Sequence, residues 1–177
     1  MNRFLKAAAA VLVCFFVFGA VSPAMAAKQE WKFAIEEITG SVQDEFAQFF
    51  KKKIMERIPD TEIEIYPVGV LGDSEDLTEQ TMNGVLHFTM ASPGHLGTFI
   101  PVVRVFSLPF IWSDKMEVNK EVMKNSVAIY GLLEKEYEKH NLKLLGVFPE
   151  GWQVWTANKP LRTPDDCKNF RMRIMGD

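Results

Sequence analysis

The sequence predicts an α/β fold, built on a mostly parallel sheet with helices on both faces. Strand-like and helix-like hydrophobic patterns alternate along the chain from residue 31 onward, and this alternation is typical of parallel sheets. The first unit has a strand pattern over 31–35, a helical pattern over 42–58 and a second strand pattern over 61–68. Two strands joined by a helix at this spacing indicate a right-handed βαβ unit.

The N-terminus is predicted to be an export signal that is not part of the fold. Arg3 and Lys6 precede an uncharged apolar run over 7–20, and Ala24-Met25-Ala26 fits a signal-peptide cleavage site. A membrane anchor is the alternative, but the run is short for a bilayer span and Pro23 follows it. We therefore expect cleavage near Ala26, a periplasmic location, and no stable membrane insertion of the mature chain.

Composition narrows the possible partners and the means of stabilisation. The 177 residues carry a formal net charge of −3, and loss of Arg3 and Lys6 would make the mature chain more acidic. An acidic chain is a poor candidate for binding nucleic acid. Cys167 would be the one cysteine left after cleavage, so we expect no internal disulfide and a fold held by its hydrophobic core.

The next elements follow from local signals. Ser41 is expected to cap the helix over 42–58, whose apolar residues recur at helical spacing. A second helix is expected to begin at Leu71-Gly72-Asp73-Ser74, with Asp73 or Ser74 as its cap, and to end at Gly84. A third strand over 86–91 would place Ser92 at the carboxyl edge of the sheet, where open α/β sheets bind ligands.

The second half of the chain is predicted to continue this alternation. We expect a buried strand end over 105–110, two helices over 114–141 that meet near Asn125-Ser126, and a buried strand over 142–148. A half-buried strand is expected over 152–157. Thr163 and Pro164 have the residue types of a helix start, and the alternating residues 171–175 indicate a last strand.

Two arginines share one face of that last predicted strand. Arg171 and Arg173 alternate with Met172 and Ile174, and a guanidinium group can hold a carboxylate through two parallel hydrogen bonds. The pattern therefore allows a carboxylate-binding site. It equally allows two solvated charges on an open face.

Motifs for catalysis are missing from the sequence. The three histidines have no metal-site spacing, and neither paired cysteines nor a nucleophile elbow occurs. The glycine-containing stretch 68–72 lacks the lysine of a phosphate-binding loop. We therefore expect no enzyme, no cofactor and no metal. A periplasmic hydrolase that uses Asp73 or Glu36 is kept as a distant alternative.

The order of short motifs resembles the solute-binding subunit of TRAP (tripartite ATP-independent periplasmic) transporters, of the dicarboxylate-binding kind. The resemblance runs from about Trp31 to Asp177, and the motifs that carry it are Tyr66-Pro67, Leu71-Gly72-Asp73, Ser92-Pro93-Gly94, Leu108-Pro109-Phe110 and Asn158-Lys159-Pro160 through Arg173. It implies a periplasmic-binding-protein-like fold of two α/β lobes that close on a ligand.

The resemblance also implies the site residues. Arg173 matches the arginine that pairs with the ligand carboxylate, while Arg171 matches a position usually held by lysine. Gln153 stands where many members have a second arginine, so a second ligand carboxylate is not implied. Glu36 and Ser92 fall at cleft-lining positions. Glu36 is expected either to hold an amino or hydroxyl group of the ligand or to face water.

The resemblance predicts three parts of the chain and a function. The parts are a signal peptide over 1–26, a first lobe over 27–149 and the start of a second lobe over 150–177, so the chain is expected to stop in mid-fold and to bind ligand weakly by itself. The implied function is capture of an organic acid and its delivery to the membrane permease subunits of a TRAP transporter. A periplasmic sensor module that presents a carboxylate ligand to a receptor is the alternative.

Overall fold

The computed structural model describes residues 28–173, so the predicted signal peptide lies outside the described residues. Its sheet has three parallel strands in the order β2-β1-β3. They are β1 (Gln29–Ala34), β2 (Thr61–Tyr66) and the short β3 (Phe88–Thr89). Within the described residues, no helix is both long enough and apolar enough to cross a bilayer.

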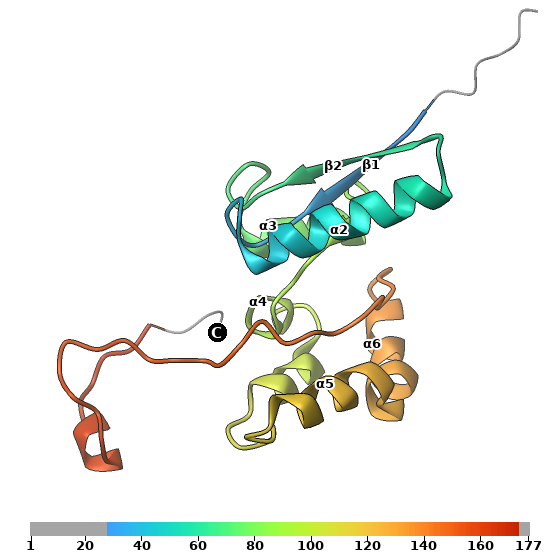
Figure 1. Cartoon of the computed structure of the whole chain (residues 1–177). Coiled ribbons are helices and arrows are strands. Elements are labelled where there is room, and N and C mark those ends of the chain that lie inside the picture. Colours follow the sequence, from blue (N-terminus) through green and yellow to red (C-terminus); the bar gives the residue numbers. More distant parts are fainter. Residues whose placement is uncertain (1–27, 174–177) are drawn as a thin grey trace, which may run out of the picture.

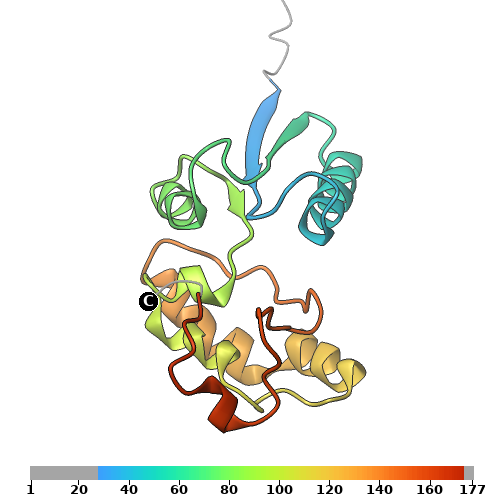
Figure 2. The same ribbon diagram turned by 90° about the vertical axis from the view of Figure 1, so that its left-hand side faces the viewer.

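Two helices cover the sheet, one on each side (Figure 2). The helix α2 (Val42–Arg57) joins β1 to β2 and begins at Ser41, whose hydroxyl accepts a hydrogen bond from the Asp44 backbone at 3.2 Å. The helix α3 (Ser74–Met82) begins at Asp73. Both predicted caps and the α/β architecture with helices on both faces are thereby confirmed.

The sheet core is small and aromatic. Phe33, Ile35, Ala47, Ile63 and Met90 are buried together between β1, β2 and α2. On the other face, Leu77 of α3 and Leu86 pack against Ala34. The predicted apolar stripe of α2 is only partly used. Of this stripe, Ala47 is buried in the core, and Phe50 and Ile54 pack against it partly buried. Phe46 and Phe49 are 43% and 61% exposed.

A second, helical part follows β3 and lies below the sheet in Figure 1. It consists of α4 (Pro93–Leu96), the 3-10 helix η1 (Pro101–Ser107), α5 (Met116–Asn125), the π-helix η2 (Ala128–Leu133) and α6 (Glu134–Glu138). Leu96, Ile100, Val103 and Leu133 form its core. The two predicted helices meeting near Asn125-Ser126 are confirmed, since α5 ends at Asn125 and Ser126 is its C-cap.

Several strand predictions for the second half are wrong. Residues 105–110 form no strand end, because Pro101 begins a 3-10 helix that packs against α4. The segments 142–148 and 152–157 also form no strands. A strand needs a neighbour to accept and donate its backbone hydrogen bonds, and one edge of the described sheet is the two-residue β3. Residues 151–160 are exposed throughout.

The C-terminal segment holds one short regular element. The 3-10 helix η3 (Pro164–Cys167) begins at Thr163, and Thr163 and Asp166 form a reciprocal capping box, so the predicted helix start is confirmed. Residues 171–173 adopt no strand, and the end of the predicted strand over 171–175 lies outside the described residues. The boundary between lobes at 149/150 stays a prediction.

Candidate functional site

Two of the four predicted site residues meet at the carboxyl edge of the sheet. Glu36 follows β1 and Ser92 follows β3, and these parallel strands end side by side. One carboxylate oxygen of Glu36, Oε2, accepts a hydrogen bond of 2.8 Å from the backbone N–H of Ser92. This contact joins two residues at the carboxyl edge of the sheet, the edge at which open α/β sheets bind ligands.

Each of these two side chains keeps a buried polar atom free for another partner. Among the described residues, neither Oε1 of Glu36 nor Oγ of Ser92 has a hydrogen-bond partner. Buried polar atoms are nearly always satisfied, and an exception marks a place where a ligand or ordered water completes the bonding. The pair thus offers one carboxylate acceptor and one hydroxyl to a guest.

The electrostatics of this pair are set mainly by burial. Burial raises the pKa of Glu36, while the hydrogen bond from the Ser92 backbone N–H and the nearby His95 oppose the shift and Glu150 adds to it. Nδ1 of His95 lies 2.8 Å from Oε1 of Glu75. A cation placed beside Glu36 would relieve the cost of keeping its carboxylate charged.

The two other predicted site residues lie elsewhere. Arg173 and Gln153 are both exposed, and the segment between them extends away from the helical part as far as η3 and then turns back (Figure 1). Trp152 and Trp155, beside Gln153, are each 60% exposed. The described structure does not bring Arg173 or Gln153 to Glu36, and their role as ligand-binding residues stays a prediction.

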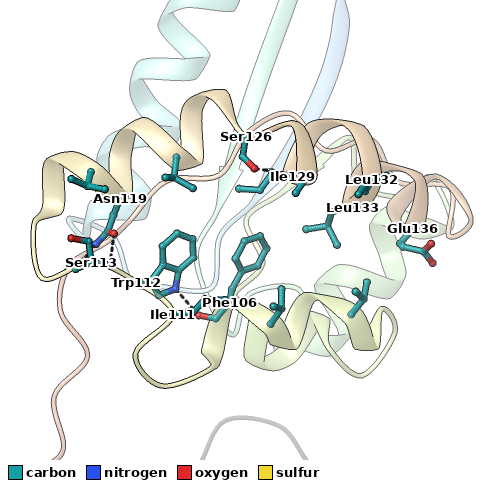
Figure 3. Close-up of a pocket in the computed structure, with 15 residues that line it drawn as sticks. Phe106, Ile111, Trp112, Ser113, Asn119, Ser126, Ile129, Leu132, Leu133 and Glu136 are labelled. Atoms are coloured by element: carbon teal, nitrogen blue, oxygen red, sulfur yellow. Dashed lines mark hydrogen bonds between the residues drawn. The ribbon is translucent and has the colours of Figure 1, made fainter.

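A hollow of about 750 Å³ lies in the helical part, and it was missed by the sequence analysis. Phe106 and Trp112 project into it from one side, and Ile129 and Leu133 from the other (Figure 3). The Trp112 indole N–H donates to the Phe106 carbonyl at 2.8 Å. The walls are largely apolar, and none of the predicted site residues lines them. The apolar residues 105–110 suggested a buried strand end, whereas Val105 and Phe106 belong to η1 and line the hollow.

Metal binding has no support in the described structure. Within residues 28–173, no group of three or more histidine, cysteine, aspartate or glutamate side chains is placed to hold a metal ion. The Glu36–Ser92 pair can accept and donate hydrogen bonds and can carry one negative charge.

Comparison with known families decides the relationship. The family described as bacterial extracellular solute-binding protein, family 7 (DctP), matches residues 33–177. The chain belongs to this family. The predicted TRAP-type resemblance is thus confirmed, and the family is one of transport solute-binding proteins and not of enzymes.

Relatives within family 7 include two ectoine binders. The ectoine-binding periplasmic protein TeaA of Halomonas elongata is 40% identical over 145 residues, which are 82% of this chain and 42% of TeaA. The ectoine/5-hydroxyectoine-binding periplasmic protein UehA of Ruegeria pomeroyi is 36% identical over 168 residues, which are 90% of this chain and 49% of UehA. The chain therefore spans slightly less than half the length of these relatives.

Solved structures of the same family share the fold. The periplasmic ectoine-binding protein of the TeaABC TRAP transporter of Halomonas elongata superposes with a TM-score of 0.74 at 40% identity, over 78% of this chain and 44% of that one. A TRAP periplasmic solute-binding protein of Chromohalobacter salexigens with bound D-glucuronate gives a TM-score of 0.65 at 25% identity, over 77% and 45%. The periplasmic-binding-protein-like fold class predicted from the sequence is confirmed.

Proposed function

We propose that this protein is the extracytoplasmic solute-binding subunit of a TRAP-type secondary transporter, and that it delivers an organic acid to membrane permease subunits. The observation that carries the proposal is the match to family 7 over residues 33–177, supported by 40% identity to the ectoine-binding protein of the TeaABC TRAP transporter. The chain acts in the periplasm after signal cleavage near Ala26. These relatives favour transport over the sensor alternative.

The ligand in this proposal carries one carboxylate and one cationic group. Arg173 holds the carboxylate, since its guanidinium can form two parallel hydrogen bonds to it. Gln153 is neutral and adds no second positive charge. Glu36 holds the cationic group through Oε1, the buried oxygen that lacks a partner among the described residues. Ectoine, which TeaA and UehA bind, has this chemistry, with a carboxylate on a cyclic amidinium ring.

The proposed mechanism makes and breaks no covalent bond. The ligand first pairs with the two charged side chains, and closure of the two lobes then removes water from the pairs and strengthens them. The closed form docks on the permease. In this mechanism Glu36 and Arg173 bind opposite ends of one ligand molecule. Selectivity among ligands then depends on the distance between the cationic group and the carboxylate of the ligand.

A thermal-shift screen of the natural full-length protein tests the proposal. Ectoine is expected to raise the melting temperature, because a ligand that binds only the folded state stabilises it by mass action. Succinate and glucuronate have no cationic group, so each should raise the melting temperature less than ectoine does. Arg173→Ala should abolish the shift by ectoine. An equal shift in the Arg173→Ala variant would remove Arg173 from the site, and no shift with any organic acid would contradict the proposed function.

A further inference from the structure

The side chain of Gln43 joins two segments that lie far apart in the sequence. Gln43 is in the first turn of α2 and is only 4% exposed. Its Oε1 accepts a hydrogen bond of 2.9 Å from the backbone N–H of Glu36, and its Nε2 donates one of 2.7 Å to Oε1 of Glu150. One amide therefore links the proposed cation-binding residue to the segment that leads to Gln153.

The segment around Glu150 is held to α2 at two places. The ring of Phe148 stacks on that of Phe46, with centroids 4.8 Å apart and planes at 4°, and Glu150 follows as the acceptor of the Gln43 amide. The next residue, Gly151, has φ +148, a conformation that favours glycine. Residues 151–160 are then exposed, so Glu150 is the last residue of this segment that contacts α2 before the exposed stretch begins.

Burial makes the two hydrogen bonds of Gln43 depend on each other. A bond to a charged carboxylate is roughly twice as strong as one between neutral groups. If Glu150 moves away, the buried Nε2 loses its acceptor, and an unsatisfied buried donor is costly. Rotation of the amide to find another partner would disturb the bond from the Glu36 backbone. The position of Glu150 is thereby coupled to the position of Glu36.

We propose that Gln43 is a positioning residue that couples the ligand-binding end of Glu36 to the start of the predicted second lobe. Gln43 does not touch the ligand. It fixes the position of Glu150, where the segment toward Gln153 begins, relative to the Glu36 backbone. This inference rests on the proposed function, because it assumes that Glu36 and the residues after Glu150 bind one molecule.

A double-mutant cycle on the natural full-length protein tests the coupling, with ectoine affinity measured by isothermal titration. Gln43→Leu and Glu150→Ala are each expected to weaken binding roughly tenfold or more. The affinity of the double variant should equal that of whichever single variant binds ectoine less tightly, because both changes remove the same Gln43–Glu150 hydrogen bond. Independent structural damage would instead multiply the two losses.

Conservative and control variants sharpen the test. Glu150→Gln keeps a side-chain oxygen for the Gln43 amide and is expected to retain most of the affinity that Glu150→Ala loses. Gln48 is exposed on the same helix and donates to the Asp44 carboxylate at 3.1 Å, so Gln48→Leu should leave affinity unchanged. If Gln43→Leu does not fold, the pair of variants at the exposed Glu150 still decides.

The possible results separate this inference from the proposed function. Wild-type protein that binds no ectoine overturns the proposed ligand class and the coupling with it. Wild-type protein that binds ectoine, together with unchanged affinity in Gln43→Leu and Glu150→Ala, overturns the coupling alone. Losses that multiply in the double variant, or no rescue by Glu150→Gln, also contradict it.

Discussion

Glu36 shows how far single residues can be assigned from sequence. Its place after the first strand and the family resemblance predicted a cleft-lining residue. The structure adds its contact with Ser92 and an Oε1 that has no hydrogen-bond partner within residues 28–173. The role of Gln43 was beyond the sequence, because its amide meets Glu150 across 107 positions. No local pattern records such a contact. Arg173 and Gln153 rest on the family resemblance and stay predictions.

The raised pKa of Glu36 predicts a pH-dependent affinity. Burial holds this carboxyl protonated to a pH above its ordinary pKa of 4.5, and only the ionised form can pair with a cationic ligand. Affinity for ectoine should therefore rise as pH increases through the raised pKa and then level off. Isothermal titration across this range is the measurement. Glu36→Gln should bind more weakly at the plateau and lose the rise.

The ligand-free protein should respond to pH with the opposite sign. Since the folded state holds the Glu36 proton more tightly than the unfolded state does, its contribution to the free energy of unfolding falls as pH rises from 4.5 toward the raised pKa. Glu117 of α5 is exposed, so Glu117→Gln is the matched control and should keep the pH dependence of affinity and that of stability. If the Glu36→Gln variant keeps the rise in affinity, another group is responsible.

At the scale of elements, the helices with local start signals and the three strands of the sheet were predictable, while the strand predictions over 142–148 and 152–157 were wrong. Ser41, Asp73 and Thr163 cap the elements that the sequence assigned to them, because a cap and its backbone partner lie within three residues. The predicted strands over 142–148 and 152–157 depended on partners elsewhere in the chain. Alternating side chains cannot reveal whether a neighbouring strand is there to pair with.

The capping box of α3 predicts a measurable loss of stability. The Asp73 carboxylate accepts a hydrogen bond from the Asp76 backbone, and the Asp76 carboxylate accepts one from the Asp73 backbone, each at 3.0 Å. Asp73→Ala removes the first bond and should lower the free energy of unfolding by about 1 kcal/mol. Urea titration followed by circular dichroism measures this. The exposed Asp60, in the turn before β2, provides the control Asp60→Ala, and equal stability of both variants would contradict the role of the cap.

At the scale of the whole molecule, the alternation of strands and helices was enough to predict a parallel sheet covered on both sides. This alternation did not predict the short helices α4 and η1, or the apolar hollow that residues of η1, α5 and η2 line. Within the helical part, the apolar residues after Pro101 form the 3-10 helix η1 and not a strand. The hollow offers apolar contact, whereas the buried carboxylate of Glu36 lies at the sheet edge beside Ser92.

The most direct test is a crystal structure of the natural full-length protein with ectoine bound. The account predicts that Oε1 of Glu36 lies within hydrogen-bonding distance of the amidinium ring and that the Arg173 guanidinium makes two hydrogen bonds to the carboxylate of the same molecule. A ligand bound elsewhere, or an Arg173 guanidinium that points into bulk water, would contradict it.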